Sequence, residues 1–216
     1  MKRMFGTVEA VFDILYLAAA LILGAVLLGD MAGNQARILA GAMALVLAFG
    51  DAFHLIPRII AIFTGQEERL RPALGRGKQI TSITMTVFYL LLWQIGGLAV
   101  SPPGELAGSY IVYLLAAVRI ALCLLPQNEW QQRYPPVGWA VLRNLPFFLL
   151  GVVVAVQFYL QRSALPGLGP MWLAIALSFG FYLPVVLYAN RNPKVGMLML
   201  PKTCAYLWML TLCLSL

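Results

Sequence analysis

Asp51, His54 and Arg58 fall on one face of a helix within the apolar segment Ile38–Phe63. Their spacing of three and then four residues places the side chains one above another on that face. A carboxyl group can donate or accept a proton, an imidazole can tune it, and a guanidinium binds phosphate. A titratable group in hydrocarbon costs at least about 2.5 kcal/mol. We therefore expect this face to point into a helix bundle and to carry the function.

Pro57 interrupts the same segment and should shape this site. Proline has no N–H, so the carbonyl of Phe53 loses its usual partner and the helix tends to kink. If Ile38 lies near the outer surface, Asp51 lies just past the midplane and Arg58 lies closer to the cytoplasm. The kink then predicts a polar pocket in the cytoplasmic half of the membrane.

Polar side chains of other apolar segments fall at a comparable depth. They supply carboxylates, cations, an amide and hydroxyl groups, from Glu9, Asp13, Thr81, Ser82, Thr84, Thr86, Arg119, Arg143, Asn144, Lys202 and Tyr206. The main polar members of the outer half are fewer, namely Gln94, Tyr110, Tyr113 and Gln157. A channel or carrier lines a path across the whole membrane, whereas an enzyme acting on a lipid headgroup needs a polar site near one interface. The asymmetry favours the enzyme.

Structural roles remain open for several of these residues. Near helix ends, long charged side chains can snorkel to the interface, which is an alternative role for Glu9, Arg58 and Arg143. Asp51 cannot snorkel easily, and its structural alternative is an ion pair with Arg119 or Lys202. His54 is the only histidine, which excludes a centre of several histidines. It either tunes Asp51 or satisfies a helix-packing hydrogen bond.

Long apolar runs must position these groups. Of the 216 residues, 62% are hydrophobic and 11% are charged, which is more apolar surface than one soluble core can hide. A spanning helix needs roughly 20 apolar residues, and seven runs come near this length: Val8–Leu28, Ile38–Phe63, Ile80–Val100, Ser109–Leu125, Trp139–Leu160, Met171–Tyr188 and Val195–Leu216. The sequence predicts an all-α, seven-transmembrane helix bundle with residues 1–216 as a single domain. Its longest connections are Gly65–Lys78 and Gln127–Val137.

The first run resembles a signal peptide only in part. It exceeds the roughly 7–15 residues of a signal-peptide core and contains two acidic residues, so we expect a retained helix. The three cysteines lie inside apolar runs and show neither CxxC nor Cys/His spacing. The sequence therefore predicts no disulfide framework, no metal site and no cofactor.

The net charge of +7 is spread over the connections rather than gathered in a patch for nucleic acid. The basic residues that fall on one side of an alternating bundle are Lys2, Arg3, Arg69, Arg71, Arg76, Lys78, Arg133, Arg191 and Lys194, and the other side receives only Arg37 and Arg162. The positive-inside rule then predicts a cytoplasmic N-terminus and a C-terminus outside. We expect a multi-pass protein of the bacterial inner (plasma) membrane.

The segment Gly50–Arg58, with the sequence GDAFHLIPR, resembles the Gly-Asp-x-x-Leu…Pro-Arg segment of YhhN-type lysoplasmalogenases. These polytopic enzymes hydrolyse the vinyl ether of lysoplasmalogens. The order of later features is also similar, with a helix entered through Gly77 that carries Ser82 and a penultimate helix that carries Ser178. The resemblance covers about residues 38–216 and is that of a divergent family member.

This resemblance implies a membrane-embedded hydrolase of lysoplasmalogens or related ether and lyso-phospholipids. Vinyl-ether hydrolysis begins with proton delivery to the enol-ether carbon, and water then attacks the oxocarbenium-like ion. Asp51 is the candidate acid, Asp13 the carboxylate that stabilises the ion or orients water, and His54 the residue that tunes Asp51. The candidate residues for binding the lipid substrate are Arg58, Arg119, Arg143, Asn144, Lys202, Ser82 and Tyr206.

Two alternatives use the same polar residues without this chemistry. One is a non-enzymatic transporter or receptor-like binding protein for a small amphiphile. The other is an opsin-like retinal protein, in which the amine of Lys202 would form a Schiff base. A membrane lipid or a lipid-like molecule is the expected partner in the first two interpretations.

Overall fold

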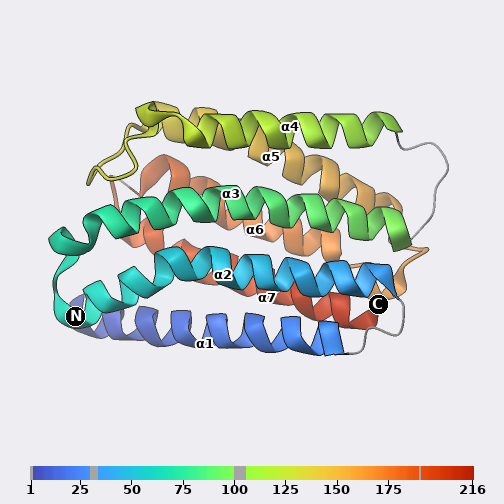
Figure 1. Ribbon diagram of the computed structural model, residues 1–216, viewed down its shortest axis with the longest axis horizontal. Helices are drawn as coiled ribbons and strands as arrows, with labels where there is room; N and C mark the ends of the chain where they lie inside the picture. Colours follow the sequence, from blue (N-terminus) through green and yellow to red (C-terminus); the bar gives the residue numbers. More distant parts are fainter. Residues whose placement is uncertain (1, 30–33, 100–105, 190) are drawn as a thin grey trace.

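Almost the whole described chain is helical (Figure 1). The computed structural model describes residues 2–29, 34–99, 106–189 and 191–216. Its α-helices are α1 (Lys2–Gly29), α2 (Gln35–Thr64), α3 (Glu67–Ala99), α4 (Leu106–Leu124), α5 (Val137–Leu160), α6 (Met171–Tyr188) and α7 (Met199–Leu212). A helix satisfies its backbone hydrogen bonds within one segment, as hydrocarbon surroundings require. The all-α prediction is confirmed.

The lengths and outer faces of the helices suit a bilayer. Within the described residues, six helices are long and apolar enough to cross a membrane, and α4 contributes a shorter apolar stretch, Gly108–Leu124. Large apolar side chains point outward around the bundle, for example Leu15, Leu114 and Leu160 with 64%, 64% and 69% exposure. In water such a surface would drive aggregation, whereas in lipid it is the stable outer face.

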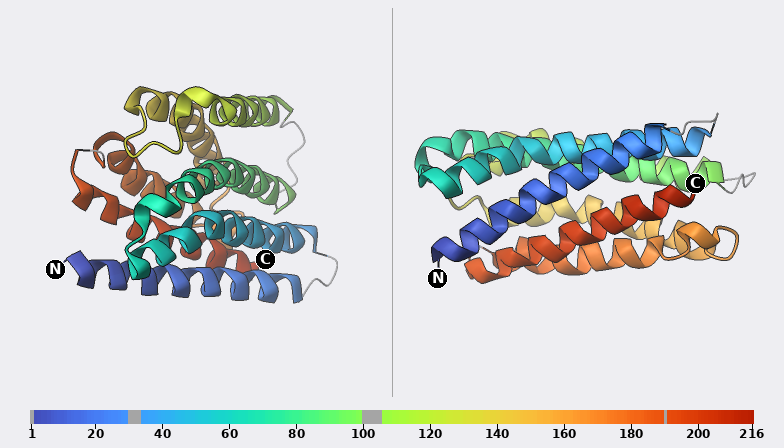
Figure 2. Two further views of the ribbon diagram at one scale, coloured as in Figure 1. Left: turned by 60° about the vertical axis from the view of Figure 1, so that its left-hand side comes forward. Right: turned by 90° about the horizontal axis from the view of Figure 1, so that it is seen from below.

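The helices alternate in direction and close into a ring. Each packs against the next along the chain, and α7 returns to pack against α1. The right view of Figure 2 shows α1 and α7 side by side, while α4 lies at one edge against α3 and α5. We use the term N-terminal end for the end of the bundle where α1, α3, α5 and α7 begin. The C-terminus lies at the opposite end (Figure 1).

The start of α3 corrects the predicted connection Gly65–Lys78. Gly65, with φ 71°, ends α2 by donating its N–H to the carbonyl of Ala61 at 2.9 Å. The next helix begins already at Glu67, which lies with Glu68 in its first turn. Acidic side chains stabilise a helix N-terminus through the macrodipole. Because these turns are polar, no apolar run marks them in the sequence.

The last α-helix begins later than its predicted apolar run, whereas α3 begins earlier than its run. Pro193–Leu198 forms a 3₁₀ helix, and α7 begins only at Met199, whereas the apolar run begins at Val195. The side chain of Asn192 accepts a hydrogen bond from the Lys194 N–H at 3.1 Å, which stabilises the tighter turn. Val100, the predicted end of the third run, lies outside the described residues.

Aromatic rings from four helices fill the centre of the bundle. Tyr89 on α3 packs edge-on against Phe147 on α5, with ring centroids 5.2 Å apart. Phe88 on α3 meets Tyr206 on α7 at 5.5 Å, also edge-on. Such pairs contribute beyond their buried area. They fix the positions of α3, α5 and α7, which carry polar side chains next to these rings.

Glycines allow α2 and α3 to approach closely beside the predicted site. A Cβ atom at Gly77 would lie 2.7 Å from the Cα atom of His54 and closer still to the Phe53 carbonyl oxygen. Both obstacles are backbone atoms, so a rotamer change cannot relieve them. Pro57 lies inside α2 a little further on, and the helix bends over its last turns (Figure 1).

We predict that Gly77→Ala destabilises the bundle. The added methyl group forces α2 and α3 apart, and overpacking of this kind costs about 1–3 kcal/mol. Thermal unfolding in detergent should therefore begin at a lower temperature. Gly138→Ala is the matched control, because a Cβ atom there meets nothing within 4 Å. An unchanged unfolding temperature for Gly77→Ala would contradict the close approach.

Candidate functional site

Asp51 lies at a contact between α1 and α2. The hydroxyl of Tyr16 donates a hydrogen bond to Asp51 Oδ2 at 2.6 Å. Asp13 lies three residues before Tyr16 on the same face of α1, and its carboxylate interacts electrostatically with Asp51. Asp13 and Tyr16 are buried, with 6% and 1% exposure. The predicted pair of carboxylates is therefore brought together by the packing of α1 on α2.

Lys202 approaches this pair from α7. Its ammonium lies over two tyrosine rings, 4.7 Å from the centroid of Tyr206 and 5.0 Å from that of Tyr182. It also interacts electrostatically with Asp51. Within the described residues no carboxylate lies within 4 Å of this ammonium, so aromatic faces are its nearest stabilising partners.

Arg119 belongs to a second group of polar side chains, at the contact of α3, α4 and α5. It is almost fully buried, with 1% exposure. Its guanidinium donates to Thr86 Oγ1 at 3.0 Å and to Asn144 Oδ1 at 3.0 Å, and it stacks 3.6 Å from the Phe147 ring centroid. Asp51 is not its partner in an ion pair. Arg119 therefore does not supply the ion pair that was one alternative for Asp51.

Arg143 extends the second group toward the N-terminal end. It donates to Asn128 Oδ1 at 2.8 Å and lies 4.2 Å from the centroid of the Trp130 ring. Asn128 is fully buried and also donates to the carbonyls of Leu122 and Leu125 at 2.7 and 2.8 Å. Arg143 is thus held by the connection between α4 and α5.

Tyrosines connect the two groups across the bundle. The Tyr182 hydroxyl donates to Asn144 Oδ1 at 3.0 Å, while its ring faces Lys202. The Tyr89 hydroxyl is buried without a hydrogen-bond partner in the described structure, and it interacts electrostatically with Tyr206. We call the two groups and these tyrosines the polar core. It comprises Asp13, Tyr16, Asp51, Thr86, Tyr89, Arg119, Arg143, Asn144, Tyr182, Lys202 and Tyr206.

Three predicted site residues lie outside this core. Arg58 forms an ion pair with Glu9 at 2.8 Å, and both interact electrostatically with Asp13. His54 packs toward α3, where Lys78 is among its charged neighbours, and its buried Nδ1 has no hydrogen-bond partner in the described residues. Ser82 bonds within its own helix, to the Lys78 carbonyl at 2.8 Å.

Three residues of the core were not predicted as site residues, namely Tyr16, Tyr89 and Tyr182. Tyr16 is the direct partner of Asp51, and Tyr182 connects Lys202 with Asn144. The spacing of Asp13 and Tyr16, three residues apart on one helix, was a signal for the first. Tyr182 lies four residues after Ser178 in a segment without charged residues, which gave no comparable signal.

The cavities differ from the predicted polar pocket. Two cavities lie between α5 and α6, and their walls are mainly apolar. Neither is lined by Asp51. Among the described residues, no three His, Cys, Asp or Glu side chains are placed to hold a metal ion together.

The fold and the polar core define a multi-pass integral membrane protein with charged groups inside its helix bundle. No protein-family model, curated protein or solved structure matches the chain. Its function must therefore be inferred from the residues themselves. The most distinctive of them are two carboxylates, a buried tyrosine and an ammonium that has no carboxylate within 4 Å among the described residues. They come from α1, α2 and α7.

We predict that Tyr16→Phe destabilises the protein through loss of the bond to Asp51. A side-chain hydrogen bond inside a membrane protein contributes about 0.6–2 kcal/mol, so the free energy of unfolding should fall by this amount in mixed micelles. The loss should disappear when Asp51 is already alanine, which a double-mutant cycle measures. Tyr110→Phe, at a ring that is 70% exposed, should have no effect. Equal losses in both Asp51 backgrounds would show that the bond does not contribute.

Proposed function

We propose that the N-terminal end of the bundle faces the cytoplasm of a bacterial cell and that all seven helices span the inner membrane. The distribution of basic residues between the two ends of the bundle supports this orientation. Arg69, Arg71 and Arg76 lie at that end with Arg133 and Arg191, whereas Arg37 and Arg162 lie at the other. An excess of basic residues is typical of cytoplasmic connections.

We further propose that the protein hydrolyses lysoplasmalogens or related ether and lyso-phospholipids. One observation carries this proposal, namely the pair of Asp13, which is buried, and Asp51, which is partly buried. Tyr16 is bonded to Asp51, and Lys202 interacts electrostatically with it. Two carboxyl groups in unequal surroundings are the usual means of dividing acid and base roles. The resemblance of Gly50–Arg58 to lysoplasmalogenases supports the same reaction.

The proposed reaction uses Asp51 as a general acid. Its proton passes to the vinyl carbon that does not carry oxygen, and the C=C electron pair forms the new C–H bond. The resulting oxocarbenium ion adds water to give a hemiacetal. The hemiacetal then breaks its C–O bond to the glycerol, as its hydroxyl loses a proton and the departing oxygen gains one, which releases a fatty aldehyde and a glycerophosphodiester with a free hydroxyl. The proton lost by the attacking water returns to a carboxylate. Asp13 stabilises the cation and receives or directs this proton.

Tyr16 and Lys202 hold Asp51 in place for this step. The hydroxyl of Tyr16 fixes one carboxyl oxygen, which leaves the other oxygen to face the substrate. Lys202 carries a positive charge that no carboxylate within 4 Å neutralises in the described residues, so it attracts the substrate phosphate. Arg119 and Arg143 extend this positive field from α4 and α5. Arg58 contributes less, because Glu9 already pairs with it.

A second candidate is binding or transport of an amphiphile without hydrolysis. The positions of the cavities favour it, because both lie between α5 and α6 with mainly apolar walls and neither is lined by Asp51. In this case the polar core holds the bundle together, and Asp51 has no reaction to catalyse. Turnover by the purified protein distinguishes the two candidates.

We predict that Asp51→Asn abolishes aldehyde release from lysoplasmenyl-phosphoethanolamine by the purified protein. Loss of a general acid costs about 100-fold to 10,000-fold in rate, and mass spectrometry of the aldehyde measures it. Glu67→Gln is the matched control, since this carboxylate is exposed in the first turn of α3, and it should retain full activity.

Two results would overturn the hydrolase. One is no turnover of any lysophospholipid by the folded wild-type protein, and the other is equal activity of Asp51→Asn and wild type. Ligand-dependent flux in liposomes without turnover would support the second candidate in its place.

A further inference from the structure

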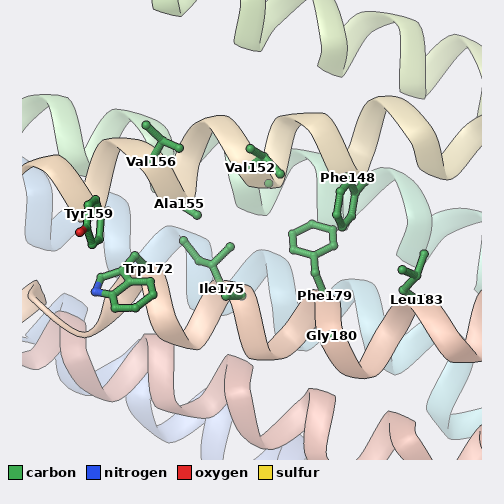
Figure 3. Close-up of a pocket in the computed structure, with 12 residues that line it drawn as sticks. Phe148, Val152, Ala155, Val156, Tyr159, Trp172, Ile175, Phe179, Gly180 and Leu183 are labelled. Carbon is green, nitrogen blue, oxygen red and sulfur yellow. The ribbon is translucent and has the colours of Figure 1, made fainter.

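A groove runs along the outer contact of α5 and α6. Figure 3 shows its walls, with Val152, Ala155 and Val156 on one helix facing Trp172 and Ile175 on the other. Its volume is about 440 Å³, within the roughly 300–1,000 Å³ of small-molecule sites. The walls are almost wholly apolar, as a hydrocarbon chain requires.

A second cavity continues this groove toward the N-terminal end. The two share Phe148, Phe179 and Leu183 in their walls, and the second has a volume of about 140 Å³. Asn144 and Tyr182 are the only polar members of its wall. Between Tyr159 and Asn144, the rise along α5 is roughly 22 Å. The combined groove is therefore long and mainly apolar, with Asn144 and Tyr182 toward the N-terminal end and the Tyr159 hydroxyl and Trp172 indole at the other end.

Two cations, Arg119 and Arg143, lie behind Asn144 and Tyr182. Asn144 Oδ1 accepts from Arg119 at 3.0 Å, and Tyr182 interacts electrostatically with both Arg119 and Arg143. Within the described residues no carboxylate lies within 4 Å of either guanidinium. An anion at Asn144 and Tyr182 would meet two cations that no acidic side chain neutralises.

We propose that this groove binds a single-chain phospholipid, with its acyl chain between α5 and α6 and its phosphate at the Asn144–Tyr182 end. This inference rests on the proposed function for the identity of the substrate, and it adds the place where that substrate enters from the bilayer. Chemical complementarity supports the assignment at both ends. The apolar walls match the chain, and the cations behind Asn144 match the phosphate.

Substitution of Gly180 by leucine should fill the groove. It lies in the wall, and an added Cβ atom would meet nothing within 4 Å. A leucine there projects into the groove without disturbing the packing of α6. Gly151 is unsuitable, because a Cβ atom there would collide with the Phe179 ring. Gly138→Leu is the matched control, since Gly138 also has open space and lies outside both cavities.

The test is photocrosslinking in micelles with lysophosphatidylglycerol that carries a diazirine in its acyl chain. Mass spectrometry should locate the label on the facing surfaces of α5 and α6. Gly180→Leu should reduce labelling there by about tenfold, equivalent to about 1.4 kcal/mol of binding, while Gly138→Leu retains it. Size-exclusion profiles equal to wild type confirm that both variants are folded.

The phosphate end has its own comparison. A monoacylglycerol with the same diazirine chain lacks phosphate and should label the groove less than the phospholipid does. Arg143→Gln should remove this preference. Arg162→Gln should keep it, because Arg162 lies at the opposite end beside Tyr159. Equal labelling by both probes in the wild type would overturn the assignment of the phosphate.

Two results would contradict lipid binding in the groove. One is labelling that is unchanged in Gly180→Leu, and the other is labelling spread evenly over the outer faces of all helices. The result is independent of catalysis, because labelling needs no turnover. Loss of labelling in Gly180→Leu with no aldehyde release by the wild type would support the groove and contradict only the hydrolase. Suppose instead that aldehyde release depends on Asp51 but persists in Gly180→Leu, and that labelling is unchanged in this variant. That result would support the hydrolase and contradict the groove as the lipid-binding site.

Discussion

The buried guanidinium of Arg119 ties three helices together. It bonds to the Thr86 hydroxyl on α3 and the Asn144 amide on α5, and it covers the Phe147 ring. A charge that faced hydrocarbon instead would cost several kcal/mol, on the order of 3 by insertion measurements. This penalty holds α4 against the bundle. Asp51 does the same on the other side, where α1, α2 and α7 meet.

Charge is distributed unevenly across the polar core. Its carboxylates, Asp13 and Asp51, come from α1 and α2, whereas its cations come from α4, α5 and α7. Lys202 stands between the two regions, because its ammonium faces Tyr182 on one side and interacts with Asp51 on the other. Acidic and basic groups that lie near one another without forming ion pairs create an electric field across the interior of the bundle. A substrate with a phosphate at one end and a basic reacting carbon near the other would align with that field.

The sequence predicted the helices better than the contacts among their side chains. Each apolar run corresponds to a helix, but the runs could not mark the polar first turns of α3, where Glu67 begins the helix outside any apolar run. The pairing of Asp13 with Asp51 followed from assuming that α1 packs on α2. Arg119 was placed near Asp51 as one alternative because depth alone was known, and depth does not say which helices are neighbours. Tyr16 was missed because a tyrosine in a membrane segment carries no large penalty that would demand a partner.

The contact of α5 and α6 is where the polar core comes next to the outer surface. Asn144 and Tyr182 belong both to the core and to the wall of the smaller cavity. On the other side, α1 and α2 pack without such space, since a Cβ atom at Gly41 would lie 2.6 Å from the side chain of Leu28. A lipid that enters sideways therefore meets the cations before the carboxylates. For a hydrolase this order has a physical advantage, because the phosphate is bound before the vinyl ether reaches the acid.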